Sequence, residues 1–332
     1  MNDNPRFEHV RRVLAMPFFR AALALAIILC LGALFNAEGS FFRWETHRDM
    51  LRHISRYGIL ACGMTLVIIT GGIDLAVGSM LGLVAVLSAL FMIHWGWSPL
   101  LAVPLCMLVG LACGVTSGTL ISRFRVQPFI ATLAMMVFAR GLAKYVSGGR
   151  KISQGVETEN GFAYLDFPRF FEFLNARILG DNVAVVTLVF LACALAAGVL
   201  LARFRPGRYM YAVGGNEEAA RLSGVPVAFI KTLAYAMSGL FAAIAGICQA
   251  AQETQGDPEA GGSYELTAIA IVVIGGTNLM GGRGSMALTL IGALTIGYLE
   301  KILSLNAVGE AGRLMLTGFI IVAAVLFQRN KS

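Results

Sequence analysis

Residues 65–80 read TLVIITGGIDLAVGSM. The apolar runs on either side, Tyr57–Thr70 and Val77–Ile93, are typical of membrane helices, and the adjacent glycines between them let the backbone leave helical geometry. Asp74 lies at this break. Because a carboxylate in hydrocarbon costs roughly 2.5–3.5 kcal/mol, we expect Asp74 to face a cavity, a partner or the membrane interface.

Apolar runs recur along the whole chain. Its 332 residues are 57% apolar and only 14% charged, unlike a soluble globular protein. Ten spans of about 20 residues use roughly 200 residues, which leaves no room for a soluble catalytic domain. The sequence therefore predicts an all-α polytopic membrane protein with about ten transmembrane helices, some broken at glycine-rich segments. The ten runs are Ala21–Phe35, Tyr57–Thr70, Val77–Ile93, Pro99–Ile121, Pro128–Val146, Val183–Leu201, Ile230–Ala251, Leu266–Gly276, Ser285–Leu299 and Leu314–Phe327.

The polar segments predict how the chain is organised. Residues 1–20 are expected to form a cytoplasmic N-terminal tail, residues 21–327 a transmembrane domain with a cytoplasmic loop at 203–226, and residues 328–332 a cytoplasmic C-terminal tail. The first run is interpreted as a retained helix, since no cleavage-site pattern follows it. With the N-terminus inside, 14 of the 26 basic residues face the cytoplasm, which is a weak bias.

The spacing of charged residues predicts two local features. Arg48, Arg52 and Arg56 recur every four residues, which indicates an interfacial helix before the second run. Arg140 and Lys144 lie near the outer end of the fifth run, where long basic side chains snorkel to the interface; the alternative is a contact with the substrate. Glycines spaced by four residues predict close helix packing in the fourth run: Gly110, Gly114 and Gly118.

A second glycine-rich segment, residues 275–282 (GGTNLMGG), repeats the pattern G-G-x-[D/N]-L-x-x-G of residues 71–78. Each copy follows an apolar run that is short for a full span. Paired glycine-interrupted segments point to the transport site in repeat-built transporters. The alternatives are a tight turn in which Asp74 caps the next helix, and a chance similarity between glycine-rich segments.

The polar stretch 203–226 contains a predicted short helix. Asn216 is expected to cap a helix from Glu217 to Ser223, with acidic residues at its positive end and Gly224 at its exit. Such a helix is marginal in water and needs a surface to pack on. It is either a docking helix for a cytoplasmic partner or an ordinary surface turn.

Several catalytic signatures are missing. The sequence contains no Gly-Lys pair and hence no Walker A phosphate loop, and its four histidines match no metalloprotease or Ser-His-Asp pattern. No pair of intramembrane carboxylates could relay protons. The net charge of +7 comes from basic residues scattered between apolar runs, which argues against a nucleic-acid surface. We predict no catalytic residues and no metal site.

Five blocks of sequence resemble bacterial ABC sugar-import permeases of the ribose, xylose and arabinose group. They follow the family order from about residue 55 to the C-terminus, whereas the first 50 or so residues and residues 149–181 carry no family motif. The blocks are residues 65–80, 126–133 (VQPFIATL), 207–225, 264–270 (YELTAIA) and 274–284.

The resemblance implies a permease subunit of the bacterial inner membrane that imports a monosaccharide. Its implied partners are a second permease copy or a homologue, a cytoplasmic ATP-binding subunit, an extracytoplasmic sugar-binding protein, the sugar and the lipid bilayer. ATP and Mg would be bound by the ATPase, and this chain would bind no cofactor. The missing Walker motif agrees with ATP being bound by the ATPase subunit and not by this chain.

The resemblance also assigns candidate residues. The substrate pathway would include Gly71, Gly72, Asp74, Gly78, Gln127, Thr132, Tyr264, Glu265, Gly275, Gly276 and Asn278. Coupling to the ATPase would involve Arg208, Gly214, Gly215, Asn216, Glu217, Glu218, Ala220, Arg221 and Gly224.

Other functions fit the sequence less well. Within the same superfamily the substrate could be another small polar solute: a nucleoside, an autoinducer sugar or a branched-chain amino acid. A secondary carrier would need no ATPase, but the lack of paired buried carboxylates argues against it. A membrane-embedded enzyme would need a catalytic set of residues.

Overall fold

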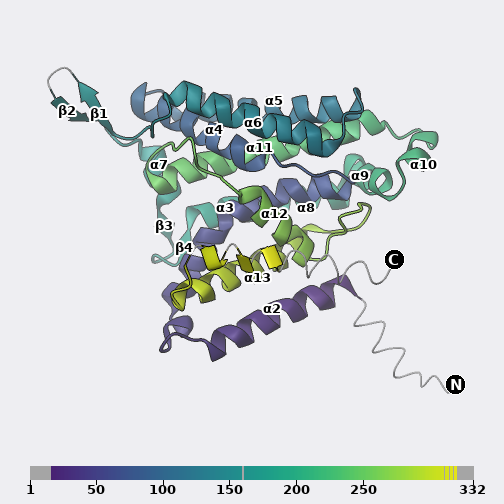
Figure 1. Cartoon of the computed structure of the whole chain (residues 1–332), viewed down its shortest axis with the longest axis horizontal. Helices are drawn as coiled ribbons and strands as arrows, with labels where there is room; N and C mark the ends of the chain where they lie inside the picture. Colours follow the sequence, from purple (N-terminus) through teal and green to yellow (C-terminus); the bar gives the residue numbers. More distant parts are fainter. Residues whose placement is uncertain (1–15, 159–160, 310, 314, 317, 320–332) are drawn as a thin grey trace.

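The computed structural model describes residues 16–158, 161–309, 311–313, 315–316 and 318–319. Within these ranges the chain is a bundle of helices that run along a common direction (Figure 1). Seven stretches are long and apolar enough to cross a membrane, which confirms the all-α polytopic fold. They are α2 (Pro17–Leu34), α4 with the π-helix η2 (Val77–Ala89, Leu90–His94), α5 (Pro99–Ser122), α6 (Pro128–Ser147), α8 (Val185–Arg203), α11 (Val227–Glu253) and α13 (Met286–Leu305).

The remaining three predicted spans have different outcomes. Tyr57–Thr70 is the second half of a longer helix, α3 (Trp44–Ile69), and Leu266–Gly276 corresponds to the short apolar helix α12 (Tyr264–Ile274). The tenth run, Leu314–Phe327, lies mostly outside the described residues, as does the greater part of both predicted tails. The first helix begins at Pro17, where proline suits a helix start, rather than at Ala21.

Helix α11 is the centre of the bundle and packs against α3, α4 and α5. The contact with α5 depends on glycine. A Cβ atom on Gly114 would lie 2.2 Å from the carbonyl oxygen of Tyr235, and one on Gly110 would lie 2.4 Å from that of Gly239. The two backbones therefore touch without intervening side chains, as the four-residue glycine spacing predicts.

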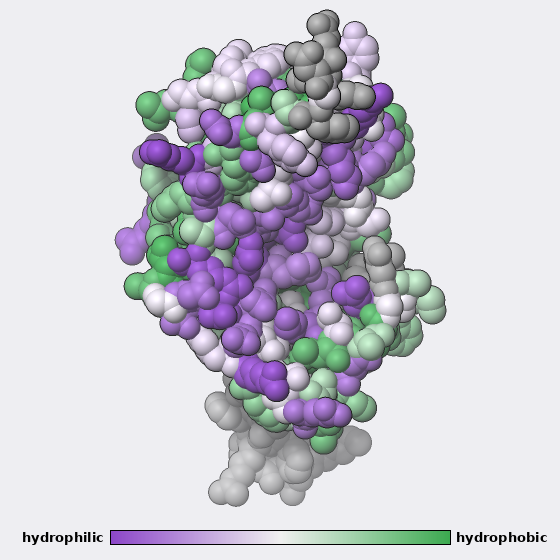
Figure 2. Space-filling model, turned by 90° about the vertical axis from the view of Figure 1, so that its left-hand side faces the viewer, coloured by the Kyte–Doolittle hydropathy of each residue, from purple (hydrophilic) through white to green (hydrophobic). Residues whose placement is uncertain are grey.

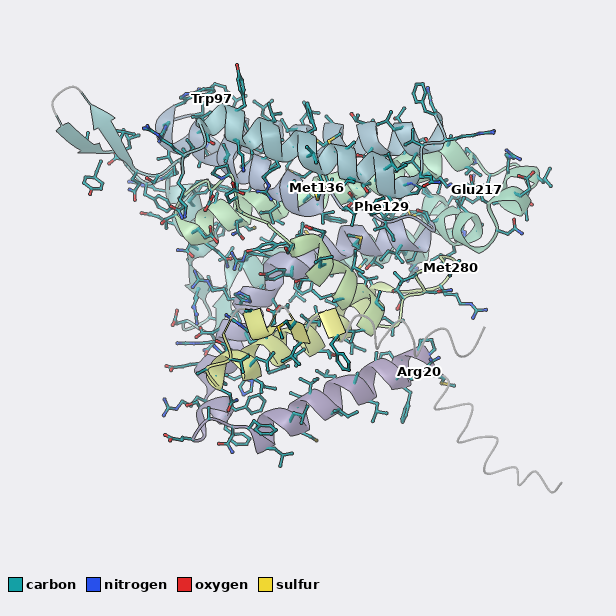
Figure 3. All side chains as sticks on the ribbon, in the orientation of Figure 1. Arg20, Trp97, Phe129, Met136, Glu217 and Met280 are labelled. Atoms are coloured by element: carbon teal, nitrogen blue, oxygen red, sulfur yellow. The ribbon has the colours of Figure 1, made fainter. Side chains whose placement is uncertain are left out.

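The two ends of the bundle differ. One end, here called the α10 end, carries α9 (Arg205–Gly215) and α10 (Glu217–Leu222). The opposite hairpin end carries η1 (Ser40–Phe42), α7 (Arg169–Asn175) and two small hairpins, β1–β2 (Gly155–Thr158, Gly161–Tyr164) and β3–β4 (Arg177–Ile178, Val183–Ala184). Seen from the hairpin end, hydrophilic residues gather across the middle of the face (Figure 2). Glu217 and Met280 lie at the α10 end and Trp97 toward the other end (Figure 3).

Helix α3 corrects the prediction of a separate interfacial helix. The helix is continuous for 26 residues, so the run that follows the arginines is not short. The arginine side chains bond to other parts of the protein. Arg48 contacts Asp181 at 3.1 Å, Arg52 donates to Asn175, and Arg56 is buried and donates to Gln249 at 2.5 Å.

Candidate functional site

Helix α10 forms where the capping pattern predicts it. The Asn216 side-chain oxygen accepts a hydrogen bond from the Ala219 amide at 2.9 Å, and Glu217 and Glu218 occupy the first turn. The helix ends at Leu222, and Gly224 follows with φ of +80°. This short helix is stabilised by its side-chain cap, by the acidic residues at its N-terminus and by the glycine that follows its C-terminus.

The helix is anchored on one side and free on the other. Ala220 is buried, and the Glu217 carboxylate pairs with Lys231 in the first turns of α11 at 2.5 Å. Glu218 pairs with Arg221 on the exposed surface, and the hydrogen bond from Arg221 lowers the pKa of the Glu218 carboxyl. Leu222 is 80% exposed. The outer face of α10 therefore presents charges and one apolar side chain to a partner.

Three glycine-containing segments meet beside α10. The Gly282 amide donates to the carbonyl of Ile69 at 2.9 Å. A Cβ atom on Gly214 would lie 1.8 Å from that same carbonyl oxygen, and one on Gly281 would lie 2.9 Å from the nitrogen of Gly71. We call this contact the glycine junction, made of residues 69–71, 214–215 and 281–282. It joins the end of α3, the end of α9 and the turn after α12, backbone to backbone.

The junction unites residues that the sequence placed in two separate sets. Gly71 belongs to the predicted pathway and Gly214 to the predicted coupling element, and no sequence signal indicated that they touch. The Gly281–Gly282 pair was part of the repeated pattern but was not among the candidate residues. A further bond supports the contact, since the Tyr211 hydroxyl on α9 donates to the carbonyl of Gly284 at 2.9 Å.

Asp74 lies in the predicted break between α3 and α4, and its side chain is buried, with only 1% exposed. The Ser238 hydroxyl on α11 donates to one carboxylate oxygen at 2.7 Å, and the Ala76 amide donates to the other at 3.0 Å. The segment is also held by Tyr235, whose hydroxyl donates to the carbonyl of Ile73 at 3.3 Å. Asp74 thus links the break to α11 and orders the backbone just before α4.

The second copy of the pattern has a different local role. The Asn278 side-chain oxygen accepts from the Met280 amide at 3.1 Å, and its amide group donates to the carbonyl of Gly281 at 3.3 Å. These bonds close a turn, and Gly276 takes the left-handed φ of +98° that glycine tolerates. A Cβ on Gly275 would lie 2.3 Å from the carbonyl oxygen of Leu288, so this turn also packs closely on α13.

A second group of predicted pathway residues meets where α4 begins. A Cβ on Gly78 would lie 2.1 Å from the carbonyl oxygen of Gly261 and 2.7 Å from a carboxylate oxygen of Glu265. The ring of Tyr264 lies 4.4 Å from the ring of Tyr57, measured between centroids. Gly72 adjoins the first group, since its Cβ would lie 2.3 Å from the hydroxyl of Tyr235.

The structure leaves two predicted pathway residues apart from these groups. Gln127 is exposed at the start of α6, and the Thr132 hydroxyl donates to the carbonyl of Pro128 in its own helix at 2.9 Å. In the described part of the chain, no hydrogen bond joins either side chain to the other candidates. Arg208 is likewise exposed, on α9.

Arg140 and Lys144, predicted to snorkel, have partners within the protein. Arg140 donates to the carbonyls of Pro258 and Ala260, the latter at 2.7 Å, and Lys144 pairs with Glu259 at 2.6 Å. These residues fasten the loop that precedes α12 to α6. Among the described residues, no group of three His, Cys, Asp or Glu side chains could hold a metal ion.

The described residues form a bundle of long apolar helices, and two glycine breaks meet beside the charged helix α10 at one end of it. This architecture is that of a polytopic membrane permease. Residues 48–325 match the family described as "Branched-chain amino acid transport system / permease component". The chain belongs to this family of ABC-importer permeases.

Curated relatives agree with that assignment. The ribose import permease protein RbsC of Escherichia coli (strain K12) is 39% identical over 309 residues, which cover 92% of each chain. RbsC of Bacillus subtilis (strain 168) is 41% identical over 93% of this chain and 92% of the relative. The L-arabinose transport system permease protein AraH of E. coli K12 is 36% identical over 84% of this chain and 80% of the relative. No solved structure gives a significant match.

Family membership confirms the predicted class of function. The chain is a multi-pass inner-membrane permease component of a binding-protein-dependent ABC sugar importer, and it is a transport subunit rather than an enzyme. ATP is hydrolysed on a partner ATPase, so the missing phosphate loop is explained by the composition of the complex.

Proposed function

We propose that this permease imports a pentose such as ribose or arabinose, with a second copy of itself or a homologue completing the membrane pathway. The support is the identity of 36–41% to permeases named for ribose and L-arabinose, over most of each chain. The α10 end faces the cytoplasm and receives the ATPase, and the hairpin end receives the sugar-binding protein. Residues 21–327 act as one permease domain between short cytoplasmic tails.

The observation that carries the coupling role is the glycine junction. Because α9 touches both α3 and the turn after α12 without side chains between them, a push on α10 reaches both breaks directly. Contacts between packed backbones transmit small displacements because they cannot be compressed. The coupling residues are thus Arg208 and Gly214 to Gly224, and the pathway residues lie along the breaks at Gly71–Gly78 and Gly275–Asn278 and along α6 and α12.

Reconstituted transport tests the proposal. The permease, its ATPase and its binding protein are placed in proteoliposomes, and uptake of labelled D-ribose and L-arabinose is measured with and without ATP. We expect that at least one pentose is taken up, and that its uptake requires both ATP and the binding protein. Excess L-leucine should not compete with that uptake. Uptake of leucine alone would point to a branched-chain amino acid importer, and gradient-driven uptake without ATPase would point to a secondary carrier.

A further inference from the structure

A polar cleft opens at the hairpin end of the bundle, beside β3 and the first half of α3. It has a volume of about 370 Å³, within the range of roughly 300–1,000 Å³ that is usual for small-molecule sites. One wall is a stripe of α3 at helical spacing: Asp49, Arg52, His53 and Arg56. The other walls come from Arg177 of β3 and from the last turn of α11, with Gln252 and Glu253.

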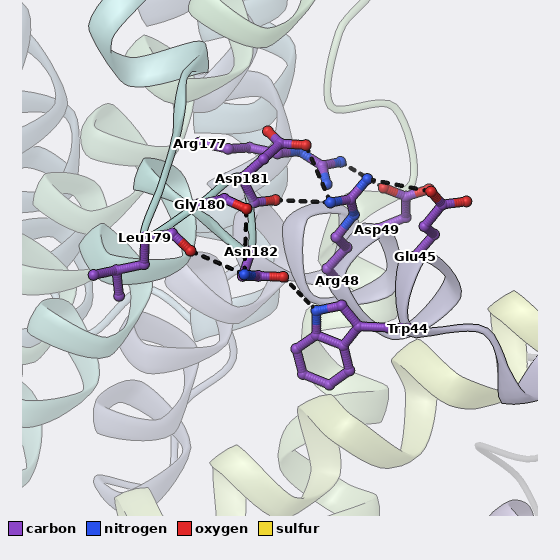
Figure 4. Close-up of polar contacts among 9 residues, drawn as sticks. All are labelled: Trp44, Glu45, Arg48, Asp49, Arg177, Leu179, Gly180, Asp181 and Asn182. Atoms are coloured by element: carbon purple, nitrogen blue, oxygen red, sulfur yellow. Dashed lines mark hydrogen bonds and ion pairs between the residues drawn. The ribbon is translucent and has the colours of Figure 1, made fainter.

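The cleft wall is held by a network between α3 and the β3–β4 hairpin (Figure 4). Arg177 pairs with Asp49 at 2.5 Å, and Arg48, outside the cleft, pairs with Asp181 at 3.1 Å. The indole nitrogen of Trp44 donates to the side-chain oxygen of Asn182 at 2.6 Å. The pair of Arg177 with Asp49 fixes two side chains that line the cleft, and the other contacts hold the β3–β4 hairpin on α3. A binding site benefits from such preorganisation.

The charges of the cleft are interleaved. Arg56 lies 3.5 Å from Glu253, Arg177 pairs with Asp49, and Arg52 donates to Asn175. An anion would meet two carboxylates there, and a cation would meet three guanidinium groups. A hydroxyl group both donates and accepts hydrogen bonds, so a neutral polyhydroxylated molecule is matched to alternating donors and acceptors. Planar guanidinium and carboxylate groups can also bridge neighbouring hydroxyls.

Aromatic rings lead inward from the cleft. The His53 ring lies 5.5 Å from the Tyr57 ring, which in turn lies 4.4 Å from the Tyr264 ring. Tyr264 begins α12 and precedes Glu265, whose carboxylate lies beside Gly78 at the start of α4. Rings of this kind provide apolar surface for the C–H faces of a sugar beside polar groups for its hydroxyls.

We infer that this outer cleft binds a monosaccharide directly, so that the permease has a sugar site of its own at the mouth of the pathway. The inference rests on the proposed function and deepens it. Sugar released by the binding protein enters the cleft, bonds to Arg52 and Gln252, and passes along Tyr57 and Tyr264 toward the breaks. No residue of this site was among the candidates from the sequence except Tyr264.

Direct binding to the complex of permease and ATPase, in nanodiscs without binding protein, tests the inference. The probes are radiolabelled D-ribose and L-arabinose. We expect saturable binding that is weakened about tenfold by Arg52→Gln, which equals about 1.4 kcal/mol, and less strongly by Gln252→Ala, because a hydrogen bond from an uncharged amide contributes less than one from a guanidinium. Among the described residues the side chain of Gln252 makes no hydrogen bond, so Gln252→Ala removes a cleft-lining amide without breaking one.

The matched control is Arg43→Gln, which removes an exposed guanidinium at the start of the same helix, outside both the cleft and its supporting network, and should leave sugar affinity unchanged. Equal affinity in wild type and both cleft variants, or no saturable binding at all, would overturn the inference. The inference would also be overturned if Arg52→Gln and Gln252→Ala kept wild-type sugar affinity and, in a separate assay with the binding protein added, weakened only its docking. ATP-driven uptake measured in parallel separates the two proposals, since pentose uptake without binding to the permease refutes the cleft and leaves the proposed function standing.

Discussion

The amide of Gly282 donates to the carbonyl of Ile69 across 2.9 Å, and this bond joins the turn after α12 to the last turn of α3. The same carbonyl oxygen is the atom that a Cβ on Gly214 would strike, at 1.8 Å. One backbone carbonyl thus marks the place where both glycine breaks and the end of α9 converge. A side chain at this place would have to separate the three segments.

Gly214→Ala should therefore destabilise the protein. To make room for the added methyl group, the Ile69 carbonyl or α9 would have to move and lose main-chain hydrogen bonds. Overpacking of this kind costs about 1–3 kcal/mol. The matched control is Gly215→Ala, the next residue of the same helix, where a Cβ would meet no atom within 4 Å. Thermal unfolding of the purified complex checks the prediction, and equal midpoints for the two variants would contradict it.

The residues around the junction show what the sequence could predict. The Asn216 cap could be predicted because its hydrogen bond reaches only Ala219, three residues away. The contact between Ile69 and Gly282 could not, because it depends on how distant helices pack. The glycine pattern located both breaks but held no information on their mutual distance.

The arginines of α3 show the same limit in another form. Their four-residue spacing correctly indicated a helix, since periodicity is a local property. It did not reveal that the helix continues to Ile69, or that Arg56 is buried against Gln249 from another helix. Charges at a membrane boundary fit lipid headgroups and protein partners equally well, so sequence alone did not reveal the protein partners.

Gly114→Ala should weaken the packing of α5 on α11. Its Cβ would lie 2.2 Å from the carbonyl oxygen of Tyr235, and relief requires the two helices to separate, at a cost of about 1–3 kcal/mol. Gly141→Ala in α6 is the control, because no atom lies within 4 Å of the added Cβ. The ratio of folded to aggregated protein after mild heating should fall for the first variant only.

Asp74→Asn should impair transport more than it lowers the abundance of the protein. The amide keeps the shape of the carboxylate but has only one accepting oxygen, so either the Ser238 hydroxyl or the Ala76 amide loses its acceptor, at roughly 1–3 kcal/mol. The break would then be less firmly held to α11. Asp166→Asn, at an exposed aspartate, is the control. Normal pentose uptake by the Asp74 variant would count against a pathway role.

Replacing Glu217 and Arg221 together by Ala should uncouple ATP hydrolysis from transport without affecting membrane insertion. Glu217 fixes α10 to α11 through Lys231, and Arg221 holds Glu218 on the exposed face, so the double change frees the helix and alters the surface offered to the ATPase. We expect the stimulation of ATPase activity by loaded binding protein to fall about tenfold, because a few residues carry most of the binding energy of an interface. Arg123→Ala removes an exposed charge beyond the end of α5 and is the control. Stimulation at the wild-type level in the double variant would show that α10 is not the coupling element.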